Sequence, residues 1–161
     1  MIPNATIAAP AAKPSAQQPR RGPPETAWNL ARGAAVFAAA SGLMTLAGWA
    51  FGVEALVRVL PGLAPMKPNT AIGLILCGLA LMMHCEADPP RWRKIARRAL
   101  PVLAGLGGMV ILLQYLTGWN SGLDTWVFGE ALVRDGLPYP GRMTHAAALN
   151  LLLAGFALAF I

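Results

Sequence analysis

Charge is scarce in this chain of 161 residues, of which only 12% are Asp, Glu, Lys or Arg. A soluble domain needs more charge than this on its surface, and about a quarter of all residues is usual. Hydrophobic residues make up 56% of the chain and gather in long apolar runs. Long apolar runs separated by short polar stretches are typical of a membrane protein.

Reactive and metal-binding side chains are scarce as well: Cys77, Cys85, His84 and His145 are all the cysteines and histidines. The cysteine spacing fits neither a disulfide framework nor a C-x-x-C metal site, so both thiols are expected to pack as apolar groups. The histidines fall about a bilayer thickness apart, which argues against a haem held between them. No zinc-protease, nucleophile-elbow or phosphate-loop motif occurs, so we predict no catalytic residue, metal site or cofactor.

The N-terminal stretch, residues 1–27, is rich in Pro, Ala and Gln and has few large apolar groups. Such a segment buries too little apolar surface to offset the entropy cost of ordering, so it is predicted to be a disordered tail. A cleaved signal peptide is the alternative. It would need an apolar stretch close to the terminus, whereas here that stretch begins only near Leu30.

Apolar segments follow the tail at 30–53, 69–83, 100–117 and 144–161. A spanning helix needs roughly 20 residues, which the first segment supplies and the second reaches if it extends from Met66 to His84. The sequence therefore predicts an all-α membrane protein with four transmembrane helices. The last segment is still apolar at Ile161, with no polar flank, which suggests a fragment of a longer protein.

The net charge of +6 is divided unevenly between the two sides of such a membrane protein. The basic excess falls in the tail, at Arg32 and in the loop 86–99, whereas the charges in 54–67 and 118–143 balance. Because cytoplasmic loops carry the excess of Lys and Arg, both the N-terminus and the chain after the last helix are predicted to be cytoplasmic. Topology and anionic lipid explain the basic loop, so no nucleic-acid partner is predicted.

Related motifs occur in the same order in the two halves of the chain. G-W-x-x-G, an apolar residue and an acid occupy 48–54 and again 118–124. Met66-Lys67-Pro68-Asn69-Thr70-Ala71 and Met143-Thr144-His145-Ala146-Ala147-Ala148 each lead into a similar apolar run. The pentapeptide EALVR also occurs twice, at 54–58 and 130–134, but its register differs from that of the other motifs, so chance can explain it.

This order predicts two parallel helical-hairpin repeats, residues 28–85 and 100–161, joined by a basic cytoplasmic loop, 86–99. The glycines of the G-W-x-x-G motifs (Gly48, Gly52, Gly118 and Gly122) are expected to allow a tight turn where a helix leaves the bilayer.

Candidate signal or packing positions lie at the ends of these helices. Trp49 and Trp119 are expected at the membrane interface, where amphipathic rings are favoured. Asn69 or Thr70 is expected to cap the second helix, and Thr144 can cap the fourth.

Three further candidates are polar residues of the second half. Gln114 and Asn150 lie well inside the third and fourth segments, where such residues usually form interhelical hydrogen bonds worth about 1 kcal/mol. Asp124 lies among several charges in the longer outside loop. That loop could receive a small signal, although a solvated loop explains the charges as well.

With both loops in place, the pattern resembles the N-terminal membrane region of bacterial sensor proteins. G-W-x-x-G-[VL]-[DE], P-G-x-x-P-M-K-P-N-T-A and G-L-A-L occur at 48–54, 61–71 and 78–81, and the partner repeat at 118–128 and 140–144. The resemblance covers about residues 28–161. His145-Ala146 departs from the Pro-Asn pair of the first repeat, which argues against a shared ligand role there.

In such proteins this region stands before PAS domains and a histidine kinase module, or before a diguanylate cyclase module. The resemblance implies the sensory input region of a bacterial inner-membrane protein-histidine kinase whose catalytic part lies beyond residue 161. A homodimer and a cytoplasmic response regulator are the implied partners. The alternatives are the input region of a diguanylate cyclase or phosphodiesterase, and a fragment of a small-solute transporter, since parallel repeats also build transporters.

Overall fold

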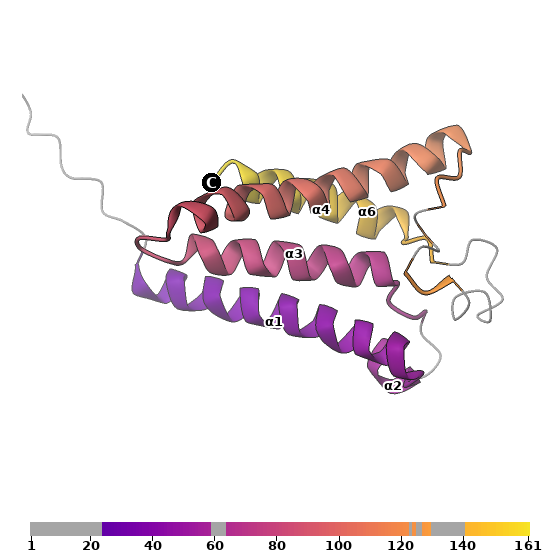
Figure 1. The fold of residues 1–161 in the computed structure, drawn as a ribbon, viewed down its shortest axis with the longest axis horizontal. Coiled ribbons are helices and arrows are strands. Elements are labelled where there is room, and N and C mark those ends of the chain that lie inside the picture. The colour runs from indigo at the N-terminus through magenta and orange to yellow at the C-terminus, as the bar shows by residue number, and fades with distance from the viewer. Residues whose placement is uncertain (1–23, 59–63, 123, 125–126, 130–140) are drawn as a thin grey trace, which may run out of the picture.

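The computed structural model describes residues 24–58, 64–122, 124, 127–129 and 141–161. Its regular elements are all helical and, in chain order, are α1 (Glu25–Phe51), α2 (Glu54–Val57), α3 (Pro68–His84), α4 (Arg91–Thr117) and α6 (His145–Ala159) (Figure 1). The predicted all-α class is confirmed for this part of the chain. Helices α1 and α4 are long and apolar enough to cross a membrane, and α3 and α6 are shorter apolar helices.

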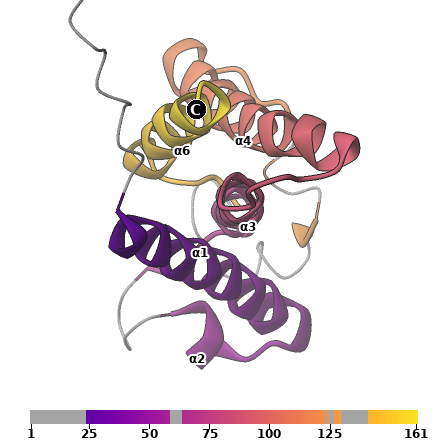
Figure 2. The ribbon, with the colours of Figure 1, turned by 90° about the vertical axis from the view of Figure 1, so that its left-hand side faces the viewer.

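Helix α3 lies at the centre of the arrangement. It packs against α1 on one side and against α4 and α6 on the other, and α4 and α6 form a second close pair. The view along α3 shows the same order, with α1 on one side of α3 and the α4–α6 pair on the opposite side (Figure 2). The fold therefore consists of two helical hairpins that meet through α3.

The long helices alternate in direction, so their ends gather at two poles (Figure 1). One pole holds the start of α1, the connection from α3 to α4 and the end of α6. We call it the basic end, because Arg32 and the basic residues of 91–98 lie there. The opposite pole, where α1 and α4 end and α3 and α6 begin, is called the loop end.

Close packing inside each hairpin depends on glycine. A Cβ atom added at Gly42 of α1 would lie 2.5 Å from the carbonyl oxygen of Ala71 in α3. One added at Gly108 of α4 would lie 2.5 Å from the carbonyl oxygen of Ala148 in α6. Real Cβ atoms do not approach so closely, so these positions bring the two backbones together as small residues do in membrane helix pairs.

Two predicted boundaries were wrong because a change in polarity was taken for the end of a helix. Helix α1 begins at Glu25, directly after the extended Pro24, so residues 25–27 are helical. The rest of the predicted tail lies outside the described residues. Helix α4 begins at Arg91, so most of the predicted loop 86–99 is helix. Arg, Lys, Ala and Leu favour helices, so the helix continues through this charged sequence.

The predicted cap of α6 is confirmed, because Thr144 Oγ1 accepts a hydrogen bond of 3.2 Å from the Ala147 N–H. The predicted cap of α3 was wrong. The extended Lys67 occupies the N-cap position, and Pro68 follows it as the first helical residue. Proline suits that position because its fixed φ fits the helix and its missing N–H costs nothing there. Asn69 and Thr70 therefore lie within the first turn of α3.

The two G-W-x-x-G motifs differ in structure. Helix α1 ends with left-handed Gly52 (φ 69°), the second glycine of its motif, whereas α4 ends with left-handed Gly118 (φ 69°), the first glycine of its motif. Gly48 is buried within α1, and a Cβ atom there would lie 2.6 Å from Val57 Cγ2. The predicted turn role of Gly48 was therefore wrong, since Gly48 makes room for α2.

Candidate functional site

A buried ion pair lies at the loop end. The Nε atom of Arg142 donates to Oδ2 of Asp124 at 2.9 Å, and each side chain is only 5% exposed. The other carboxylate oxygen, Oδ1, accepts a hydrogen bond of 3.3 Å from Nδ2 of Asn69. Two candidate residues that are far apart in sequence, Asn69 and Asp124, are thus brought together and linked to the segment that precedes α6.

Tyr115 extends this polar group toward α6. Its hydroxyl donates to the carbonyl oxygen of Met143 at 2.9 Å, and the Arg142 guanidinium lies 5.4 Å from the centre of its ring. The ring also stacks on His145, with 3.6 Å between the ring centroids. We call Asn69, Tyr115, Asp124, Arg142 and His145 the loop-end cluster; it connects α3, α4 and the start of α6.

A second contact at the loop end involves the candidate Trp49. Its indole Nε1–H donates to the carbonyl oxygen of Met66 at 2.9 Å, and the Lys67 ammonium lies 5.9 Å from the centre of its ring. Trp49 thus ties the last turn of α1 to the start of α3. Trp119, its counterpart in the second motif, follows α4 and is 58% exposed.

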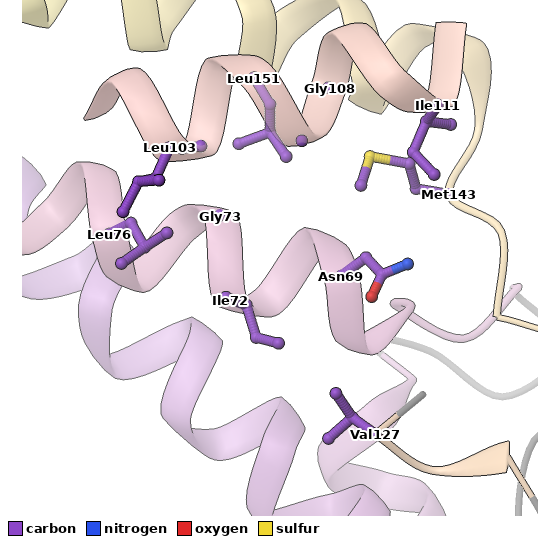
Figure 3. A pocket seen from close by; sticks show the side chains of 12 residues that line it. Asn69, Ile72, Gly73, Leu76, Leu103, Gly108, Ile111, Val127, Met143 and Leu151 are labelled. Carbon is purple, nitrogen blue, oxygen red and sulfur yellow. The ribbon is translucent and has the colours of Figure 1, made fainter. Parts of the chain in front are cut away.

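An apolar cavity of about 190 Å³ lies between α3 and α4, beside the loop-end cluster. Figure 3 shows Leu76 of α3 and Leu103 of α4 at one end of it, and Asn69 and Met143 at the other. Leu151 of α6 reaches it from the side opposite α3. Asn69 is the one lining residue, among those the structure describes, with a polar side chain. The cavity therefore has aliphatic walls and an amide at one end.

Gln114 and Asn150, the two polar candidates inside apolar segments, lie in opposite environments. Gln114 is fully buried, but its Nε2 donates to Ser121 Oγ in the segment directly after α4, not to another helix. Its Oε1 atom is buried and has no hydrogen-bond donor among the described residues. Asn150 is exposed on α6, and its side chain forms no hydrogen bond within the part of the chain that the structure describes. The predicted interhelical hydrogen bond of Gln114 was therefore wrong, whereas that of Asn150 stays a prediction. Hydrophobicity alone does not reveal which face of a helix is buried.

The remaining candidate, Thr70, is half-buried in the first turn of α3. Cys77 and Cys85 are buried free thiols, as the sequence predicted. In the described residues, no group of three or more His, Cys, Asp and Glu side chains is placed to hold a metal ion. The second EALVR copy lies outside the described residues, whereas the first forms α2 and its C-cap.

Sequence reasoning missed the pairing of Asp124 with Arg142 and the stacking of Tyr115 on His145. The available signal was the presence of opposite charges in one loop, but several alternative partners lie in the same loop. Choosing among them requires knowing which charges are buried.

Comparison of the chain with protein-family models, with curated proteins and with solved structures finds no match. What the described residues define is an all-helical protein with two helices of membrane-spanning length and a polar cluster beside an apolar cavity.

Proposed function

We propose that this chain is the membrane-embedded sensory input region of a bacterial signal-transduction protein. Its helices α1, α3, α4 and α6 would cross the inner membrane as two hairpin repeats. The output would be a PAS-containing histidine kinase that acts on a cytoplasmic response regulator. The motifs that resemble those of bacterial sensor proteins support this output. A diguanylate cyclase or phosphodiesterase module is the alternative output.

The distribution of side-chain size between interior and surface is the observation that carries the membrane part of this proposal. The buried positions of the helices are largely alanine and glycine: Ala35, Ala71, Ala80 and Ala148 are fully buried. Most of the large apolar side chains point outward, and Phe37 is 75% exposed. Exposing such an apolar surface to water is unfavourable, whereas lipid solvates it. Small residues at helix contacts are also typical of membrane proteins.

Charge supports the orientation. The basic end carries Arg32 and the basic first turns of α4, which supports a cytoplasmic location for it under the positive-inside rule. Arg93 and Lys94 pair with Glu86 and Asp88 there, at 2.5 and 3.3 Å, but Arg91, Arg97 and Arg98 remain as basic excess in this connection. The loop end, with its cluster and cavity, would then face the periplasm.

Reporter fusions test this orientation. After Ile161, a reporter that works only in the cytoplasm is expected to be active and one that works only in the periplasm to be inactive, because α6 ends at the basic end. After Arg58, which follows α1 and α2, the reverse is expected: only the reporter that works in the periplasm should be active. The opposite pattern, or recovery of the chain without detergent as a soluble protein, would contradict the proposed topology.

A homodimer is the second part of the proposal, and Asn150 supports it. An exposed amide on an otherwise apolar helix lacks a hydrogen-bond partner in lipid, and a second copy of α6 can supply one. Ala146 and Ala154 lie one turn away on either side and are exposed too, so two such faces can approach closely.

Replacing Asn150 by Leu is expected to weaken dimerisation by roughly 3- to 30-fold, the effect of about 0.6–2 kcal/mol of interhelical hydrogen bonding. Energy transfer between labelled copies in bilayers measures the dissociation constant. Asn29→Leu, the same change at an exposed position of α1, is the matched control and is expected to leave it unchanged. Equal effects of the two substitutions would contradict an α6 interface.

The signalling role rests on the connections made at the loop end. The loop-end cluster joins α3 to the start of α6, so a change at the cavity can alter how α6 packs against α4. Helix α6 ends at the basic end, where an output module would be attached. The direct test is the reading frame of the gene beyond the codon for Ile161. PAS and kinase sequence there is the expected result, and a stop codon or further transporter-like helices would contradict it.

A further inference from the structure

We propose that the cavity between α3 and α4 binds a lipid-soluble, single-ring aromatic molecule that carries a hydroxyl group, with the Asn69 side chain accepting its hydrogen bond. This inference names the stimulus class of the proposed sensor. Its consequence for signalling rests on that proposed function. The binding itself does not, since it can be measured on this chain alone.

The size of the cavity favours one ring. Its volume is about 190 Å³. A dry protein cavity of about 150 Å³ lined by aliphatic side chains binds benzene, so a ring with one or two small substituents fits here. Leu151 of α6 fills the space beside the lining residue Gly73, and the backbone of α6 fills that beside Gly108, so the free space lies toward Gly107, where an added Cβ atom would meet nothing within 4 Å.

The opening of the cavity favours a molecule that dissolves in lipid. Leu103 and Gly107 of α4 both line the cavity and are exposed, with Leu103 57% accessible. A Cβ atom added at Gly107 would have no atom within 4 Å, so this side of the cavity is open space. In the proposed membrane arrangement that opening faces acyl chains, and a ligand would reach it from the bilayer.

Asn69 determines the chemistry of the polar end. Its Nδ2 is engaged with Asp124, whereas its Oδ1 accepts no hydrogen bond from the residues that the structure describes. Figure 3 shows Oδ1 on the side of Val127, another lining residue, and Nδ2 on the side of Met143. An accessible acceptor next to apolar walls selects a ligand with one hydrogen-bond donor. A phenol or quinol ring has that character.

Methyl resonances provide a direct measurement of binding. Met143 is 3% exposed and lines the cavity, whereas Met44 lies on the exposed face of α1. With ¹³C-methyl methionine in the chain, a ligand in the cavity shifts the Met143 signal to saturation, whereas simple partition into lipid or detergent affects Met44 as well. The probes are p-cresol, p-xylene and 1-heptanol, which have equal numbers of non-hydrogen atoms.

We expect p-cresol to shift Met143 to saturation at free concentrations roughly 3- to 10-fold lower than p-xylene, as one added hydrogen bond implies. We expect 1-heptanol to bind more weakly than p-cresol. Equal affinities of p-cresol and p-xylene would overturn the role of Asn69, and stronger binding of 1-heptanol would overturn the preference for a ring. Parallel shifts of Met44 and Met143 would overturn the site itself.

Filling the cavity supplies the control variants. Gly107→Leu is expected to abolish the saturable Met143 shift, and Gly107→Ala to weaken it. Gly33→Leu is the matched change, because a Cβ atom at Gly33 of α1 also has no neighbour within 4 Å and lies away from the cavity. Retained binding in Gly107→Leu would overturn the proposal. If p-cresol bound in the cavity but did not change the activity of an attached signalling module, the sensory role would be contradicted, whereas the ligand site would be confirmed.

Discussion

Replacing Arg142 by Met is expected to lower the free energy of unfolding by about 3–5 kcal/mol, the usual cost of removing one partner from a buried ion pair. The Asp124 side chain is 5% exposed, and it would keep its hydrogen bond from the Asn69 amide but lose the guanidinium 2.9 Å away. Its carboxylate would then be a buried charge without a counter-charge in this pair. Unfolding by a denaturing detergent in micelles, followed by circular dichroism, measures the change.

Two controls separate burial from charge. Lys94→Met removes an ion pair with Asp88 at the basic end, where the side chains are 50% and 94% exposed, and is expected to change stability little. The double variant Asp124→Leu with Arg142→Met removes both buried charges and is expected to recover most of the loss. A double variant as unstable as Arg142→Met alone would show that the cost comes from packing and not from the uncompensated carboxylate.

Alanine at two neighbouring glycines of α4 is expected to have opposite effects. Gly108→Ala places a Cβ atom 2.5 Å from the Ala148 carbonyl oxygen and 3.0 Å from the Leu152 nitrogen, both backbone atoms of α6. A backbone cannot rotate away as a side chain can, so α4 and α6 must separate, at a cost of about 1–3 kcal/mol. Gly107→Ala meets nothing within 4 Å and is expected to stabilise the helix by about 0.5–1 kcal/mol.

The same unfolding measurement compares the two alanine variants. Their helix propensities change identically, so any difference in stability between them reports the approach of α6. If both variants were stabilised, the close α4–α6 contact would be wrong, and if both were destabilised, Gly107 would not border open space.

The helices themselves could be predicted from hydrophobicity. Each of the four apolar segments corresponds to a helix, and the Thr144 cap followed from residue type and position. Helix ends were harder to predict, because the basic residues from Arg91 continue α4 outside the apolar run. A transition from charged to apolar residues marks an expected change of solvent, which need not coincide with a change in backbone conformation.

The candidate site was only partly predictable. Asn69 and Asp124 were chosen for their polarity and position, yet the hydrogen bond between them depends on Asp124 lying beside the start of α3. Gln114 and Asn150 have similar polarity but opposite environments, one buried and one exposed. Which side of α4 or α6 faces α3 is set by glycine contacts such as Gly73 against Leu151. Each of those contacts joins residues that are distant in the sequence, and a single sequence does not show which residues meet in space.

The alanine- and glycine-rich interior also has a consequence for conformational entropy. Alanine and glycine have no side-chain rotamers to lose, so bringing α1 against α3 at Ala35 and Gly42 fixes few side-chain torsions. In the proposed membrane arrangement, the leucines and phenylalanines on the outside would keep their torsional freedom among fluid acyl chains. The free energy that opposes helix association is therefore small, and modest van der Waals attraction between close backbones suffices to hold the hairpins together.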